Sequence, residues 1–422
     1  MLSTKEVKLD LGKYEQGLAL EVATSIKKSE HNVERTIGLD MGSTNNRLVP
    51  YNIEAEDENE IFGEVVEVSS DLGIVGDISH IKSVSSKIYD NLEFIIKDVT
   101  VPDKKENKMF SEEHFVKYGL YQSVANQTLA RPSNISKVDL EATYINALAT
   151  MAIDIYLTIQ ATGIVRPCYH IIPAITLPPE DFKSAIFTNR FKARMAGHYS
   201  VEMPRLGVSF NILIDEDNIF VDKEPNAVVY QLATEYDTIT EVTTVALDGG
   251  GKSIDVSLVV DGVLVEKGSA TIPYGGNLLV EDIKDEYVRT TAKSAPNDLA
   301  IKRALSSGIL VRGKNIEDIT EIIKAAKETM ARRIFNDLIK IFDRANLSID
   351  DIGFFAFHGR LFEDTLREEA DGDTIKTITA GRVSDGIQDM LAKVNDNIET
   401  CVVTDTATIA TGVAVSRMVD ES

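Results

Sequence analysis

Hydrophobic residues follow two different periods along the chain, and stretches with the two periods alternate. Between Glu317 and Arg344 the apolar side chains stand three or four residues apart with charged residues between them, which predicts an amphipathic helix packed on a core. Short β-rich runs elsewhere predict strands. These runs are Thr36–Leu39, Tyr169–Leu177, Thr243–Leu247, Ser257–Val260, Gly353–Phe357 and Thr400–Val403. Because the strands are interleaved with helices, the pattern predicts an α/β fold.

A second long apolar run covers Tyr144–Val165. Its length would allow it to cross a membrane, but three polar residues interrupt it, namely Asn146, Asp154 and Gln160. We therefore interpret it as a buried helix and expect no membrane segment. Asp139 is placed to cap this helix, and Gly163 is placed to end it.

The length and composition limit the class of protein. At roughly 100–200 residues per domain, 422 residues predict more than one domain, and 43% hydrophobic with 26% charged residues predicts a folded chain. The 44 basic and 67 acidic residues give a formal charge of −23, which argues against direct DNA binding because that requires a basic surface. The only two cysteines, Cys168 and Cys401, exclude a disulfide framework and favour a cytoplasmic location.

The most informative feature is an internal repeat. Residues 36–49 read TIGLDMGSTNNRLV, and residues 244–257 read TVALDGGGKSIDVS. In each copy a β-rich run ends in an aspartate, turns through glycine and polar residues, and enters a second apolar run. Each copy predicts a β-hairpin with an acid at its mouth, Asp40 in the first and Asp248 in the second.

Each of these turns suits a phosphate and a metal ion. Glycine lets backbone N–H groups approach an anion closely, and the hydroxyl groups of Ser43, Thr44 and Ser253 add donors. Asp40 and Asp248 would then face Mg²⁺, which keeps much of its water shell and is commonly held through water. Two such hairpins facing each other would clamp one nucleotide. One turn alone is also a common structural hairpin, and the spacing of a Walker loop is absent.

The two repeats resemble the phosphate motifs of the actin-like ATPase superfamily. The first, DMGSTNNRL from Asp40, resembles the form typical of ParM-type bacterial plasmid-segregation actins, and the second is DGGGKSID from Asp248. Glu224-Pro225-Asn226-Ala227 is similar to the start of the family's connecting helix, and Thr408–Val415 to its second connecting helix. Ala300–Leu305 is similar to the helix that touches ribose and adenine. Phe355–Arg360 takes the place of the adenosine motif, with His358 where the family has a glycine.

The resemblance implies roles for particular residues. Glu224 would orient the attacking water, and Asp40 and Asp248 would complete the catalytic set and hold Mg²⁺ through water. The nucleotide contacts that it implies are Gly42, Ser43, Thr44, Asn45, Arg47, Gly249, Gly250, Gly251, Lys252, Ser253, Lys302, His358 and Gly359.

Several of these residues also have a purely structural interpretation. Glu224 suits the positive end of a helix dipole, and Lys252 suits a solvated turn. Arg47 would serve either as a phosphate contact or in a salt bridge. His358 suits packing against the base better than metal binding, because no spaced set of ligands accompanies it. Asp255 suits a structural role or the support of residues that bind the nucleotide.

The resemblance also implies a domain organisation. Two actin-like domains, each built on a ribonuclease-H-like sheet, would hold the nucleotide in the cleft between them. Domain I would cover 36–240 and be completed by 399–422, with a small inserted subdomain at about 60–130. Domain II would cover 241–398. Residues 1–35 would form an N-terminal extension, and both this extension and the insertion are candidate contact surfaces.

The function implied is that of an ATPase that forms filaments. ATP, with GTP as the alternative, and Mg²⁺ would control polymerisation, and the filament would drive plasmid DNA segregation. Its partners would be further copies of itself and a small DNA-binding adaptor on a centromere-like site, with no membrane involved.

Three other members of the superfamily offer alternatives. A small-molecule kinase shares the fold, but a second-substrate motif is not found. A non-hydrolysing cytoskeletal scaffold would usually carry an amphipathic membrane-binding end, for which the C-terminal residues SRMVDES are unsuitable and residues 1–35 are only weakly amphipathic. A DnaK-type chaperone would need a peptide-binding domain after the last motif, where we expect too few residues.

Overall fold

The computed structural model describes residues 27–28, 30–42, 45–52, 54–55, 61–69, 72–74, 93–100, 114–118, 127–128, 136–182, 185–203, 207–236, 239, 241–261, 263–371, 374–395, 398, 400–404 and 408–421. Most of the predicted extension 1–35 lies outside these residues. The chain divides into two units, and each is described by itself. The first combines Met1–Gln231 with Ile409–Ser422, and the second is Leu232–Thr408.

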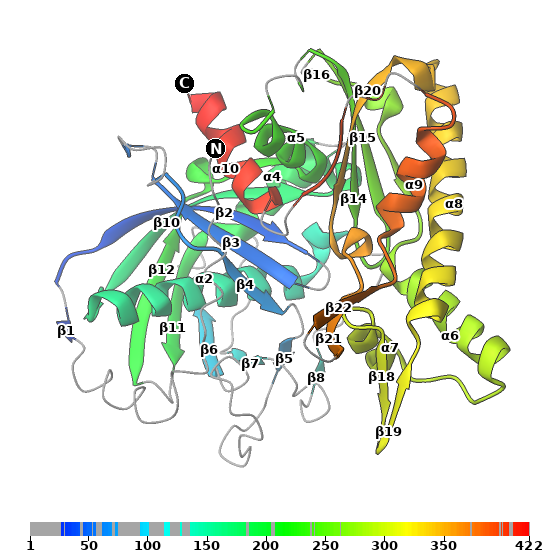
Figure 1. Cartoon of the computed structure of the whole chain (residues 1–422). Coiled ribbons are helices and arrows are strands. Elements are labelled where there is room, and N and C mark those ends of the chain that lie inside the picture. Colours follow the sequence, from blue (N-terminus) through cyan, green and yellow to red (C-terminus); the bar gives the residue numbers. More distant parts are fainter. Residues whose placement is uncertain are drawn as a thin grey trace. The chain divides into compact units, whose positions relative to one another are not determined.

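The first unit is built on one large sheet (Figure 1). The strands of this sheet are β2 (Val33–Met41), β3 (Asn45–Tyr51), β4 (Val66–Ser69), β5 (Leu72–Ile74), β6 (Glu93–Asp98), β7 (His114–Tyr118), β8 (Gln127–Thr128), β10 (Cys168–Leu177), β11 (Gly197–Met203), β12 (Val208–Ile214) and β13 (Phe220–Lys223). Two further strands of the unit, β1 (Lys27–Lys28) and β9 (Ile164–Val165), pair with each other. Its helices are α2 (Glu141–Thr162), α3 (Pro179–Phe182), α4 (Ala185–Met195), α5 (Glu224–Ala233) and α10 (Thr408–Glu421), with 3₁₀ turns η6 (Lys137–Asp139) and η8 (Glu216–Asn218).

The second unit holds a smaller sheet and two separate hairpins. Its strands are β14 (Thr243–Gly249), β15 (Ile254–Val260), β16 (Val263–Leu264), β17 (Ala270–Ile272), β18 (Ile309–Arg312), β19 (Asn315–Asp318), β20 (Ile352–His358), β21 (Leu366–Asp371), β22 (Thr374–Thr379) and β23 (Thr400–Val403). Its helices are α6 (Gly276–Thr291), α7 (Asp298–Ala304), α8 (Thr320–Ala345) and α9 (Val383–Leu391), with 3₁₀ turns η10 (Glu266–Gly268), η11 (Ile349–Asp351) and η12 (Arg360–Phe362).

The two main sheets repeat one strand order. In the first unit β2 and β3 form an antiparallel hairpin, β4 pairs antiparallel with β3, β10 runs parallel to β2, and β13 runs parallel to β10. In the second unit β14 and β15 form the hairpin, and β17, β20 and β23 take the places of β4, β10 and β13. A helix follows the last strand of each set, α5 after β13 and α10 after β23. Both predicted hairpins and the internal repeat are therefore confirmed.

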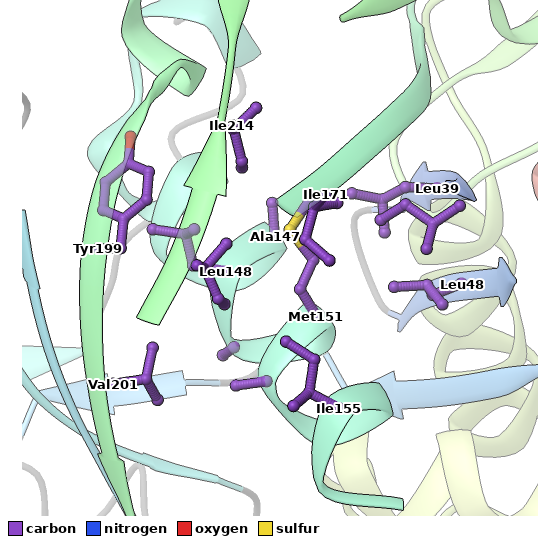
Figure 2. Packing of buried hydrophobic residues seen from close by; sticks show 14 of the residues in the cluster. Leu39, Leu48, Ala147, Leu148, Met151, Ile155, Ile171, Tyr199, Val201 and Ile214 are labelled. Atoms are coloured by element: carbon purple, nitrogen blue, oxygen red, sulfur yellow. The ribbon is translucent and has the colours of Figure 1, made fainter. Parts of the chain in front are cut away.

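Helix α2 covers one face of the first sheet. Successive strand residues point to opposite faces, so Ile37 and Leu39 share a face, and both belong to the cluster that α2 fills. Figure 2 shows Met151 and Ile155 of α2 beside Leu48 of β3. Although α2 is long and apolar enough to span a membrane, 89% of its apolar window is buried inside the protein. The interpretation of this run as a core helix is confirmed.

Helices α10 and α5 approach the sheet and each other through glycines. A Cβ atom built on Gly38 of β2 would lie 2.0 Å from the carbonyl oxygen of Ala410 in α10. A Cβ atom on Gly412 of α10 would lie 1.7 Å from the carbonyl oxygen of Ala227 in α5. Only glycine allows contacts this close at the two positions. Because Asp40 alternates with Leu39 along β2, it lies on the same face as Gly38.

The described strands within 60–130 extend the first unit's main sheet, in which β6 pairs with β11. Two sequence expectations differ from the structure. The return to the first unit falls at Ile409 and not at 399, because β23 pairs with β20. Asp139 does not cap α2, whose N-cap is Leu140; its carboxylate binds Arg190 instead, with Nη1 and Oδ1 2.7 Å apart.

The core of the second unit forms between its main sheet and α8. The predicted apolar stripe is buried in a cluster with β14 and β20, so this prediction is confirmed. The helix begins at Thr320 and not at Glu317, because Asn315–Asp318 pair with Ile309–Arg312 as strand β19.

One basic side chain, Lys327, is buried in this core. Its Nζ donates to the carbonyl oxygens of Glu363 and Gly381, at 3.1 and 2.6 Å, and to Oγ1 of Thr365 at 2.7 Å. Burial lowers the pKa of Lys327 to about 8, against an ordinary value of 10.5. The ammonium group therefore connects α8 to the segment 363–365 and to Gly381, although burial disfavours its charged form.

We predict that Lys327 makes stability depend on pH. Between about pH 8 and about pH 10.5 the unfolded lysine binds more protons than the folded one, so its contribution to the free energy of unfolding rises with pH, by up to about 3 kcal/mol. Denaturant unfolding of the wild type and of Lys327→Met at about pH 7.5 and about pH 9.5 measures this, since other groups cancel in the difference. Equal pH dependence of the two proteins would contradict the prediction.

Candidate functional site

The first hairpin presents a buried ion pair at its mouth. Asp40 at the end of β2 lies opposite Arg47 of β3, and Arg47 Nη1 donates to Asp40 Oδ2 at 3.2 Å. Both side chains are buried, with 3% of Asp40 and 7% of Arg47 exposed. Arg47 therefore forms a salt bridge, which is one of the two roles that its sequence position suggests. Burial raises the pKa of Asp40 above its ordinary value, and the Arg47 guanidinium opposes this rise.

A second ion pair lies in the same unit. Glu224 is the first residue of α5, where its negative charge complements the helix dipole, and it is only 6% exposed. Lys137 Nζ donates to Glu224 Oε1 at 2.6 Å. Both Glu224 and Lys137 act electrostatically on Asp40, the first raising and the second lowering the pKa of that carboxyl group. Asp40 and Glu224 thus belong to one cluster that contains two acids and two cations.

The start of α5 is fixed by Asp222, two residues before Glu224. Its Oδ1 accepts from Nδ2 of Asn226 at 2.8 Å, and its Oδ2 accepts from Oγ of Ser416 in α10 at 2.6 Å. Asp222 is 8% exposed. The position of the Glu224 backbone therefore depends on α10 as well as on β13.

The second hairpin carries the glycine-rich turn. Asp248 lies opposite Asp255, whose Oδ1 accepts from Oγ1 of Thr271 at 2.6 Å. That bond is the structural role expected for Asp255. Asp248 is half-buried, and Gly249 next to it is buried.

Two glycines and the start of α6 pack against the glycine-rich turn. The amides of Gly276 and Asn277, at the N-terminal end of α6, donate to the carbonyl oxygens of Gly250 and Gly251 at 2.9 and 2.8 Å. A Cβ atom on Gly275 would lie 2.3 Å from the carbonyl oxygen of Gly250. The carbonyl groups of the turn thus face α6, and the turn conformation is fixed by its contacts.

The expected adenosine segment ends beside Asp248. Gly359 has φ +95°, and a Cβ atom there would lie 2.6 Å from the carbonyl oxygen of Gly249 and 3.1 Å from Asp248 Oδ1. His358 is buried at the end of β20, with Nδ1 2.8 Å from Thr404 Oγ1. The packing role considered for His358 agrees with this burial.

The structure brings together only part of the predicted set within each unit. Asp40, Arg47 and Glu224 cluster in the first, where Gly42 is half-buried. Asp248 lies beside the glycine-rich turn and Gly359 in the second. Further residues of the set are placed as follows: Lys252 is exposed, Ser253 is half-buried at the end of the turn, Lys302 lies exposed on α7, Ser43 and Thr44 fall outside the described residues, and of Asn45 the backbone alone is described.

Sequence reasoning missed Lys137 and Gly275. The glycine pair Gly275-Gly276 directly before an amphipathic helix was a usable pattern, because it indicates close backbone approach at a helix start. Lys137 left no local pattern, since its partner Glu224 lies 87 residues away in the sequence.

Two units with the same strand order, each with an acid at the mouth of its first hairpin and a connecting helix after its last strand, define the actin-like fold. Solved structures share it with this chain. One is an archaeal actin homologue, with a TM-score of 0.63 and 14% identity, covering 92% of this chain and 100% of that one. A 15-stranded ParM filament from Clostridium botulinum has a TM-score of 0.60 and 14% identity, covering 92% of this chain and 99% of that one. Bacillus thuringiensis ParM with ATP has a TM-score of 0.57 and 13% identity, again covering 92% of this chain and 99% of that one. The predicted fold, close to that of ParM, is confirmed.

No protein-family model and no curated protein sequence matched the chain. The likeness to the solved structures therefore establishes the fold.

Proposed function

We propose that this protein is an actin-like ATPase whose filaments assemble under nucleotide control. The observation that carries the proposal is the repetition of an acid-tipped hairpin, Asp40 in one unit and Asp248 in the other, at equivalent places in two sheets of the same order. A structural hairpin has no need of a carboxylate at its mouth, whereas the metal ion of a metal–triphosphate is commonly held by carboxylates. The likeness to ParM with ATP and to a ParM filament supports the same function.

The chain's own residues fit ATP and Mg²⁺. Carboxylates are the ligands that Mg²⁺ prefers, and Asp40 and Asp248 would hold it through water. A Cβ atom at Gly249 would lie 2.7 Å from Cε2 of Phe362 and 2.8 Å from Cβ of Leu361, so only glycine lets the turn beside Asp248 pack this closely on η12. When bound, the metal neutralises phosphate charge. His358 and Lys302 would contribute to the nucleoside side of the site.

Glu224 would orient the water that attacks the γ-phosphorus. A carboxylate on the first residue of a helix starts from a fixed backbone position, which in-line attack requires. Subunits would add to the filament with ATP bound and leave after hydrolysis. We further propose that this cycle moves plasmid DNA in the cytoplasm, with a small adaptor protein joining the filament to the DNA.

Sedimentation of the full chain with Mg²⁺ and ATP, ADP, GTP or no nucleotide tests the proposal, together with phosphate release. We expect pelleting that requires a nucleoside triphosphate and is followed by disassembly as phosphate appears. Turnover without pelleting would favour a small-molecule kinase, and pelleting without turnover would favour a scaffold; either result would overturn the proposal.

We predict that Glu224→Ala keeps nucleotide binding but slows phosphate release by about 100-fold, because loss of a water-orienting group removes stabilisation made only in the transition state. Filaments of the variant should persist longer than those of the wild type. Glu216→Gln, which changes an exposed carboxylate in η8, serves as the matched control. Unchanged phosphate release by Glu224→Ala would remove this residue from the mechanism.

A further inference from the structure

Lys137 is not among the residues for which the sequence predicts a role in hydrolysis, although it is bonded to Glu224. The 2.6 Å separation of Nζ and Oε1 is short for a hydrogen bond between charged groups. The Lys137 side chain is 22% exposed and that of Glu224 is 7% exposed. Water therefore screens the attraction less than it would on the surface, where such pairs contribute little.

The turn that carries Lys137 is held firmly by its neighbours. The amide of Lys137 donates to Asp181 Oδ2 at 3.2 Å. The carbonyl oxygen of the next residue, Val138, accepts from the hydroxyl of Tyr144 and from Nη1 of Arg194, both at 2.8 Å. Val138 itself is fully buried. Because the backbone is anchored on both sides of the lysine, its side chain reaches Glu224 from a fixed origin.

Two acids in this cluster are each matched by a cation. Arg47 binds Asp40 across the hairpin, and Lys137 binds Glu224 from a different part of the chain. The ammonium group is a point charge on a flexible stem, in contrast to the planar fork of an arginine. A single Nζ···Oε1 bond to Glu224 leaves the second carboxylate oxygen for a different donor.

We propose that Lys137 is a positioning residue for Glu224, an inference that rests on the proposed ATP hydrolysis. By binding Oε1, the ammonium fixes the plane and direction of the carboxylate. The other oxygen, Oε2, then accepts a hydrogen bond from the attacking water in a constant orientation. Lys137 acts through Glu224 and has no contact with the nucleotide.

Steady-state kinetics of full-length variants tests this role. In Lys137→Met we expect kcat for ATP hydrolysis to fall about 10- to 100-fold while KM for ATP stays within about twofold, because orientation of the water is lost and substrate binding is kept. Lys137→Arg, which keeps the charge, should recover part of the loss. Lys324→Met, at an exposed position of α8, is the matched control. Lys137→Gln, which keeps a donor without the charge, repeats the test if the methionine variant does not fold.

A double-mutant cycle separates positioning from a structural role. In a Glu224→Ala background, Lys137→Met should change the single-turnover rate by less than about twofold, since the residue through which the lysine acts is gone. An equal fall in both backgrounds, or a rise in KM in both, would overturn the inference in favour of folding or of direct nucleotide contact. If the wild type hydrolyses ATP and Lys137→Met has the same kcat, this inference alone is overturned. If the wild type does not hydrolyse ATP, both this inference and the proposed function are overturned.

Discussion

Gly412→Ala is expected to destabilise the protein by about 3 kcal/mol or more, which exceeds most single substitutions. A Cβ atom at this position would lie 1.7 Å from the carbonyl oxygen of Ala227, 2.5 Å from its carbonyl carbon and 3.0 Å from its Cα. All three are backbone atoms of α5, so no side-chain rotation relieves the contact. The two helices would have to separate, and the packing around them would be lost.

Thermal and denaturant unfolding of the purified variant measures the effect. Gly276→Ala is the matched control, because the nearest atom to a Cβ there is 3.7 Å away, which is ordinary van der Waals contact. A midpoint for Gly412→Ala close to that of the wild type would show that α5 and α10 separate at little cost.

The consequence for the candidate site follows from the position of α5. Glu224 begins this helix, and Asp222 just before it is bonded to Ser416 of α10. A variant of Gly412 that still folds should therefore lose hydrolysis along with stability. The close approach of α10 is thus part of what places the water-orienting carboxylate.

The elements that the sequence predicted correctly are those whose pattern is local. The apolar stripe of α8 repeats within one segment, and Gly163 ends α2 in the left-handed conformation that favours glycine. The hairpins at Asp40 and Asp248 were equally readable, because their strands are separated by short turns of glycine and polar residues.

What the sequence did not predict depends on contacts between distant segments. Strand β6 joins the main sheet by pairing with β11, about a hundred residues later, and the apolar pattern of a strand does not specify its partner. Asp139 has the chemistry of a helix cap, but Arg190 competes for its carboxylate. The Lys137–Glu224 pair also joins distant segments. From the sequence alone, a lone lysine before a helix is interpreted as a solvated charge, because the acid that it binds is not its neighbour in the sequence.

The largest effect on activity is expected from the two hairpin aspartates. Asp248→Ala and Asp40→Ala should each lower ATP hydrolysis by at least about 100-fold, because each removes a negative charge that helps to place the metal and to balance the charge of the transition state. Phosphate release measured across a range of Mg²⁺ concentrations distinguishes this role: both variants should require more Mg²⁺ than the wild type. Asp389→Asn, at an exposed position of α9, is the control.

The two substitutions should differ in stability. Asp40 is 3% exposed and pairs with buried Arg47, so Asp40→Ala leaves a buried guanidinium without this carboxylate and should cost about 3 kcal/mol. Asp40→Asn keeps an oxygen acceptor for Arg47 and should cost less. Asp248 is only half-buried, so Asp248→Ala should unfold near the wild type while losing activity. If Asp248→Ala hydrolysed ATP at the wild-type rate, the likeness of the two hairpins would extend to their strand order and not to their chemistry.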